Sequence, residues 1–193
     1  MIKRFFLFSV FFIFLFGCKQ KKKEPEKKFI SVLSLIKAQV AHVDTSLYSI
    51  VKVVSVDSLH SDTTYIRRED FETAAKDFLE IPDLSDKKIA KRFKESTLYD
   101  ETINRVVITY TPENPSKEEV QKQELLITPD LANGDKVNSI IITKTVTNRD
   151  SSVQKNMLWQ MDKSFQVATT RQLPGKPETI TTVKVTWNEG YQQ

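Results

Sequence analysis

Cysteine and histidine are scarce in this chain, and their scarcity limits both its cross-links and its metal chemistry. The 193 residues include one cysteine, Cys18, and two histidines, His42 and His60. A single thiol cannot form an internal disulfide, so we expect the folded domain to depend on its hydrophobic core alone. No HxxxH, HExxH or paired-cysteine spacing is present, so the sequence predicts no bound metal.

Glycine is also scarce, and the glycine-containing motifs of common enzymes are missing. The chain has four glycines, and they form no GxGxxG, GxxxxGK(S/T) or GxSxG motif. A Ser-His-Asp triad assembled by the fold stays open as an alternative, with Asp44 near His42 and Asp62 near His60 as orienting acids. Adjacent acidic pairs are typical of solvated surfaces, and the chain has Glu69-Asp70, Asp100-Glu101 and Glu118-Glu119. We therefore expect no catalytic activity and no cofactor.

The chain contains one long hydrophobic run, which lies at its N-terminal end. Lys3 and Arg4 precede the apolar residues 5–17, among which phenylalanine predominates. A transmembrane helix needs about 20 apolar residues, so this run is too short to cross a bilayer comfortably. Two positive charges followed by a short apolar region are typical of a secretory signal peptide, which we predict over residues 1–17.

The predicted signal peptide leads into Leu15-Phe16-Gly17-Cys18, which resembles the lipobox of bacterial lipoproteins. Phe16 departs from that pattern, in which small residues are usual. The resemblance implies that Cys18 is lipidated, becomes the mature N-terminus, and holds the protein stably on a membrane through its acyl chains. The alternatives are an uncleaved membrane anchor and an ordinary signal peptide beside an incidental Cys18.

Positive charge is concentrated around this cysteine rather than in the domain that follows. Residues 1–28 hold eight Lys/Arg and two Glu, which leaves 21 basic and 23 acidic residues over 29–193. The domain is therefore mildly acidic, and we expect no nucleic-acid partner. Residues 18–28 comprise the cysteine and a basic stretch with nothing to bury. We predict that this stretch is a disordered tether, with a polybasic contact to anionic lipid as the alternative.

The charge of this tether also bears on location. Lipoproteins displayed on the surface of Bacteroidota resemble one another in carrying acidic residues soon after the cysteine, whereas KQKKKEPEKK follows Cys18 here. The difference implies an outer-membrane position facing the periplasm, with the inner membrane left open. The expected partners are the membrane, through lipidated Cys18, and either an envelope protein or a lipid.

Residues 29–193 have the size of a single domain. Their apolar residues recur with a helical period in some segments and with a period of two in others. A helical period predicts helices over 29–43 and 71–79, the second stopped by Pro82. A further helix is expected to begin with Ser85 or Asp86 as its cap and to bury Ile89 and Phe93. A period of two, broken by turn residues, is typical of strands. It predicts strands over 48–56, 63–66, 103–111, 120–128, 136–147, 152–161, 164–172 and 178–187.

Short connections between successive strands favour antiparallel pairing. We therefore predict an α+β fold in which N-terminal helices pack on one face of a mainly antiparallel meander sheet. Besides the lipobox, the segments Tyr65–Phe71, Phe78-Leu79 and Val185-Thr186-Trp187 carry a loose resemblance. They are similar to segments of a group of small, uncharacterised Bacteroidota lipoproteins. This resemblance implies the fold and the location but no activity.

Two groups of residues are candidates for binding. The first is apolar, because Met157, Trp159, Phe165 and Trp187 lie on faces of neighbouring predicted strands. They either form the core beneath the helices or line an apolar concavity for a lipid, a peptide or a partner protein. The second is Arg67-Arg68, which we expect to pair with the acidic residues that follow or with residues at the sheet edge, with an anion site as the alternative.

An anchor, a tether and a domain without a catalytic motif predict a non-catalytic, membrane-anchored envelope lipoprotein that acts as a binding or accessory module. The alternative is a lipid- or lipoprotein-carrying module, which resembles outer-membrane acceptor lipoproteins with a half-open sheet. That alternative predicts an apolar cavity between the sheet and the helices. A hydrolase is the distant third interpretation.

Overall fold

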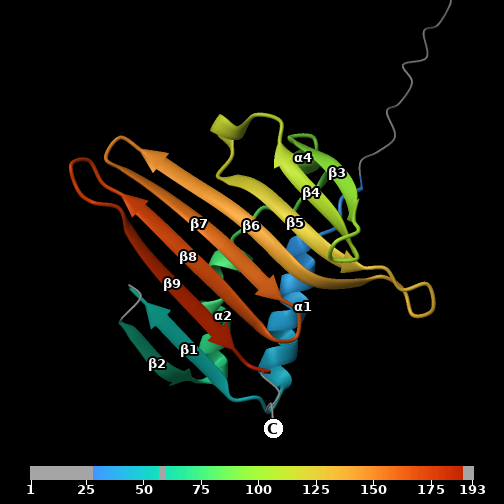
Figure 1. Cartoon of the computed structure of the whole chain (residues 1–193), viewed down its shortest axis with the longest axis horizontal. Coiled ribbons are helices and arrows are strands. Elements are labelled where there is room, and N and C mark those ends of the chain that lie inside the picture. The colour runs from blue at the N-terminus through green and yellow to red at the C-terminus, as the bar shows by residue number, and fades with distance from the viewer. Residues whose placement is uncertain (1–27, 57–59, 189–193) are drawn as a thin grey trace, which may run out of the picture.

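The computed structural model describes residues 28–56 and 60–188 of the chain. The predicted signal peptide, Cys18 and almost all of the predicted tether lie outside these residues. Nine strands form one antiparallel sheet and the helices are short, so the described chain is mainly sheet (Figure 1). The prediction of a mainly antiparallel sheet is confirmed.

Seven consecutive strands make up most of this sheet, and each is antiparallel to the next. They are β3 Phe93–Asp100, β4 Arg105–Pro112, β5 Val120–Thr128, β6 Lys136–Asn148, β7 Ser151–Gln160, β8 Ser164–Gln172 and β9 Thr179–Thr186. The six strands predicted from residue 103 onwards are confirmed, with small shifts of their ends. The turn residues Gly134 and Gly175 have positive φ angles of 86° and 69°, which glycine adopts without steric cost.

The remaining two strands form an N-terminal hairpin that joins the sheet beside its last strand. β1 Ile50–Ser55 pairs with β2 Ser61–Ile66, as predicted. On its other side β1 pairs with β9, where Val51 lies opposite Thr186. The strand order is therefore β2-β1-β9-β8-β7-β6-β5-β4-β3. The simple meander that we predicted is extended by a pairing between distant parts of the chain.

Among the described residues, one helix is longer than a single turn. This helix, α1 Val32–Thr45, has 14 residues and begins where the Ser31 hydroxyl accepts a hydrogen bond from the Ser34 N–H. The predicted helix over 71–79 is split at Ala75, where a ψ angle of 2° separates α2 Phe71–Ala74 from α3 Lys76–Leu79. The short 3-10 helices are η1 Arg68–Asp70 and η2 Pro115–Lys117.

The predicted helix that buries Ile89 and Phe93 is wrong in its second half. Asp86 caps its start by accepting hydrogen bonds from the N–H groups of Lys88 and Ile89, but the helix, α4 Lys87–Ala90, ends after one turn. Phe93 then begins β3, where it lies opposite Pro112. β3 is an edge strand with mostly exposed side chains, so hydrogen bonding to β4 defines it rather than hydrophobic alternation.

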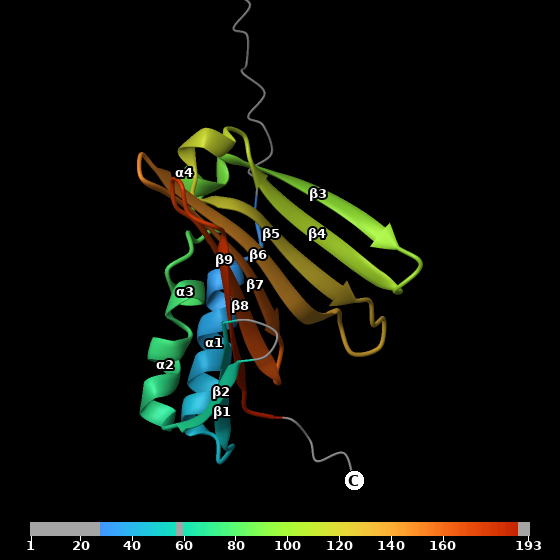
Figure 2. The ribbon, with the colours of Figure 1, turned by 60° about the vertical axis from the view of Figure 1, so that its left-hand side comes forward.

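Five aromatic residues, the aromatic cluster, join the helices to the sheet: Phe71, Phe78, Trp159, Phe165 and Trp187. The ring of Phe71 lies 5.1 Å from that of Trp187, and the ring of Phe78 lies 5.1 Å from that of Trp159. Trp159 also stacks on Phe165 at 5.1 Å. Trp159 lies on β7 and Phe165 on β8, and Trp187 follows β9 directly. Figure 2 shows α1, α2 and α3 beside these strands. Tilted and edge-on ring contacts of this kind stabilise a core beyond the area that they bury.

The start of the described chain is held by contacts to two other segments. The N–H of Ile30 donates to the Tyr110 hydroxyl on β4 at 3.0 Å, and the Phe29 ring lies 4.7 Å from that of Tyr110. The Ser31 hydroxyl donates to Asp83 at 2.8 Å. These contacts fix the entry of the chain between β4 and the loop that precedes α4.

Candidate functional site

The four apolar residues predicted as a ligand or partner surface lie in the core. Met157, Trp159, Phe165 and Trp187 are 1%, 0%, 1% and 3% exposed. Trp159 and Phe165 are covered by Phe78 of α3, and Trp187 is covered by Phe71 of α2. A ligand would reach these side chains only if the helices moved away from the sheet.

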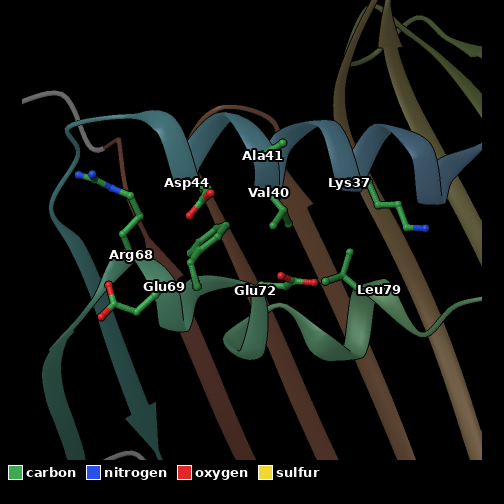
Figure 3. Close-up of a pocket in the computed structure, with 9 residues that line it drawn as sticks. Lys37, Val40, Ala41, Asp44, Arg68, Glu69, Glu72 and Leu79 are labelled. Carbon is green, nitrogen blue, oxygen red and sulfur yellow. The ribbon is translucent and has the colours of Figure 1, made fainter.

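A candidate binding groove lies instead within the helical part of the molecule. A groove of about 520 Å³ separates α1 from the segment formed by η1, α2 and α3 (Figure 3). From α1 it is lined by residues spaced at i, i+3, i+4 and i+7, which share one helix face: Lys37, Val40, Ala41 and Asp44. From the opposite segment it is lined by Arg68, Glu69, Phe71, Glu72 and Leu79.

The floor of the groove is apolar and fixed. Phe71 is 1% exposed and Val40 is 9% exposed, and Leu79 packs against the core at the side. Because Phe71 also belongs to the aromatic cluster, the floor of the groove is continuous with the core of the domain. An apolar group lying here would cover Val40 and Leu79 without disturbing the sheet.

Carboxylates stand over this floor. Figure 3 shows Asp44 pointing from α1 toward the opposite segment, and Glu72 directed along the groove toward Leu79. Within the described residues, neither Asp44 nor Glu72 has a side-chain hydrogen bond or ion pair. Glu69 differs, because Arg67 holds it at 3.0 Å. Two carboxylates of the groove are thus available to a positively charged group of a ligand.

The two cationic side chains of the groove lie at opposite ends (Figure 3). Lys37 is near the start of α1, where its charge acts on Asp83. Burial opposes ionisation of Asp83, but hydrogen bonds from Ser85 and Ser31 and the charge of Lys37 hold its pKa below its usual value. Arg68 lies at the other end, and its Nε is buried without a hydrogen-bond partner among the described residues.

The prediction for Arg67-Arg68 is confirmed for the first residue and wrong for the second. Arg67 pairs with Glu69 at 3.0 Å and with Asp70 at 2.9 Å. The hydrogen bond and the charge of Asp70 raise the pKa of Arg67. Arg68 makes no ion pair within the described part of the chain. Figure 3 shows its side chain directed away from Glu69 and toward the C-terminal end of α1. Its guanidinium therefore faces the negative end of that helix dipole.

The histidines stay outside this groove. His42 is exposed on the last turn of α1, and its ring lies 6.2 Å from that of Tyr48. His60 precedes β2, and Asp62, its proposed orienting acid, is exposed on that strand. Of the acids considered for a triad, Asp44 alone lines the groove. In residues 28–56 and 60–188, no three His, Cys, Asp or Glu side chains are arranged to hold a metal ion.

Comparison with family models, with curated proteins and with solved structures finds no match for this chain. Within the described ranges, no helix has the length and the apolar character needed to cross a bilayer. The groove combines an apolar floor, two carboxylates that have no ion-pair partner in the described part of the chain, and a cation at each end. This combination suits a ligand with an apolar body and a positively charged group.

Proposed function

We propose that the protein is a non-catalytic, membrane-anchored envelope lipoprotein whose helices carry a binding groove. In this proposal α1, α2 and α3 form a layer over one face of the sheet. Their inner side supports the fold through the aromatic cluster, and their outer side binds the ligand. The observation that carries the proposal is the groove between α1 and η1–α3, with its apolar floor and the carboxylates of Asp44 and Glu72.

The ligand that fits this groove best is a segment of a partner protein. Such a segment would place an apolar side chain over Val40 and Leu79 and a Lys or Arg beside Asp44 and Glu72. A groove of about 520 Å³ is within the range of about 300–1,000 Å³ that is typical of small-ligand pockets, so it has room for side chains of such a segment. The partner is expected in the envelope, where the predicted lipid on Cys18 would place the domain.

A lipid-carrying module is less well supported. That function needs an apolar cavity between sheet and helices, but Phe71 and Phe78 fill the space over Trp159 and Phe165. Opening such a cavity would expose several aromatic rings at once, at a cost of about 1.5–3 kcal/mol for each ring. The groove on the outer side of the helices requires no such opening.

Site-specific photocrosslinking in living cells tests the groove. A photoreactive phenylalanine at Ala41 lies in the groove, whereas the same residue at Ala38 is exposed on α1 but does not line the groove. We expect a defined protein adduct from position 41 and none from position 38. The adduct should disappear when Glu72→Lys is added, since the new charge repels a basic segment. Equal adducts from both positions, or none from either, would refute binding in the groove.

The anchor is tested separately. Because lipoprotein processing requires the modified cysteine, Cys18→Ser should leave an uncut precursor that stays in the membrane through residues 5–17. Mature-sized protein from this variant would show that Cys18 is incidental.

A further inference from the structure

A cationic surface lies where the described chain begins. The contacts of Ile30 with Tyr110 and of Ser31 with Asp83 place this point next to the loop that leads into α4. Both Figure 1 and Figure 2 show α4 at the same end of the molecule as the beginning of the described chain. Arg92 pairs with Glu118 at 2.6 Å, which brings η2 to the same corner of the domain. The surface therefore comes from three segments that are distant in sequence.

Four lysines define this basic corner: Lys28, Lys88, Lys91 and Lys117. All four are exposed, and none has an ion-pair partner within the described residues. Lys88 on α4 and Lys91 just after it face outward, whereas Ala90 between them is buried and Ile89 packs against the core. The acids nearby offset part of this charge. Asp86 caps α4, Glu118 pairs with Arg92, and Glu119 pairs with Lys144. Glu113 and Glu95 are also exposed, and Glu95 lies near Tyr110.

We propose that the basic corner docks the domain on an anionic membrane surface. The inference rests on the anchor in the proposed function, because the predicted lipid on Cys18 and the tether 19–28 connect to the chain at this corner. Lysines near an anionic leaflet attract it within about one Debye length, roughly 8 Å at physiological ionic strength. The tether, with six lysines and two glutamates over 19–28, adds charge of the same sign.

Docking at this corner also sets the orientation of the groove. α1 starts close to the corner, and its 14 residues carry the helix about 21 Å away from it. The membrane would therefore lie beyond the start of α1, and the groove along its side would stay open to a partner in the periplasm. The corner and the groove are separate surfaces with separate ligands.

The docking test uses the full lipidated chain in vesicles of phosphatidylcholine alone or of phosphatidylcholine with phosphatidylglycerol. A fluorophore on Ser116→Cys reports the basic corner, and one on Leu47→Cys reports the end of α1, where Leu47 is 95% exposed. Energy transfer to a headgroup acceptor measures the distance of each from the membrane. We expect stronger transfer from position 116 in the anionic vesicles, lost at high salt, and no such gain from position 47.

Charge removal provides the matched comparison. Lys88→Gln with Lys91→Gln should reduce the ratio of docked to undocked domain about 25-fold, since each lysine contributes about fivefold. Lys136→Gln with Lys163→Gln removes two exposed lysines elsewhere and should leave the ratio unchanged. Unfolding curves of both double variants show whether the fold is intact.

The outcomes separate this inference from the proposed function. Equal transfer in both lipids, or equal effects of the two double variants, would overturn docking while leaving the anchor and the groove in place. Protein that separates from both kinds of vesicle would instead refute the anchor, and the docking inference would fail with it.

Discussion

The two sides of the helical segment differ in a way that explains what each does. Toward the sheet, Phe71 and Phe78 make ring contacts with side chains that are almost completely buried. Away from it, the same helices present Asp44 and Glu72 above a narrow apolar floor, without ion pairs in the described part of the chain. Substitutions on the inner side should therefore change stability, whereas substitutions on the outer side should change binding.

The largest effect is expected from truncating the inner side. Phe78 is 0% exposed and contacts both Trp159 and Phe165. Phe78→Ala should lower the free energy of unfolding by about 3–5 kcal/mol, because it removes a buried ring and leaves a cavity. Urea denaturation of the mature protein measures this loss. The neighbouring Leu79→Ala, at the side of the groove, should cost clearly less, and the reverse order would contradict the comparison.

A second buried aromatic residue makes stability depend on pH. Burial, together with the nearby carboxylate of Glu95, raises the pKa of Tyr110 from 10.0 to about 12, although the hydrogen bond from the Ile30 N–H opposes this shift. The folded state therefore retains a proton that the unfolded state loses above pH 10. Stability should fall by about 2–3 kcal/mol between pH 10 and pH 12. Tyr110→Phe should flatten this decline. An unchanged slope would show that other groups cause it.

The ion pair between helix and sheet should contribute less than either aromatic residue. Lys155 on β7 donates to Asp77 on α3 at 2.5 Å, and their side chains are 28% and 32% exposed. Pairs that water reaches are typically worth about 0.2–1 kcal/mol. Asp77→Asn should therefore cost less than about 1 kcal/mol in a thermal or urea denaturation experiment. A larger loss would mean that this pair, rather than the aromatic cluster, holds α3 to the sheet.

The smallest effect on stability is expected at the groove. Asp44→Asn and Glu72→Gln remove charges from exposed positions that make no ion pair with any described residue. Each should therefore change the free energy of unfolding by less than about 0.5 kcal/mol. The crosslinked adduct from position 41 should nevertheless weaken in both variants. Destabilisation on the scale of Phe78→Ala would instead assign these carboxylates a structural role.

Most strands could be predicted because the sequence pattern that specifies them is local. Alternating apolar residues and turns such as Asn133-Gly134 place β4–β9 within two residues of their observed bounds. β3 was missed because an edge strand with exposed side chains has no hydrophobic alternation. The pairing of β1 with β9 joins residues far apart in the chain, which periodicity alone does not reveal.

The groove was not predictable for a related reason. Lys37, Val40, Ala41 and Asp44 share a helix face that the sequence indicates, but nothing local shows that residues 68–79 will lie opposite them. In contrast, the burial of Trp159 and Trp187 was one of two interpretations that the strand pattern allowed. The strand pattern identified the large apolar side chains of the sheet, but it did not show which part of the chain would cover them.

Amide hydrogen exchange shows whether the outer side of the helices binds a partner. The lipidated protein is compared in its native membranes and after purification in detergent at high salt. We expect slower exchange of amides 40–44 and 69–72 in the membranes, with amides of β7 and β8 unchanged. Ala41→Trp should remove this difference, whereas Ala38→Trp should retain it. Identical exchange of the groove amides in both preparations would contradict binding on the outer side.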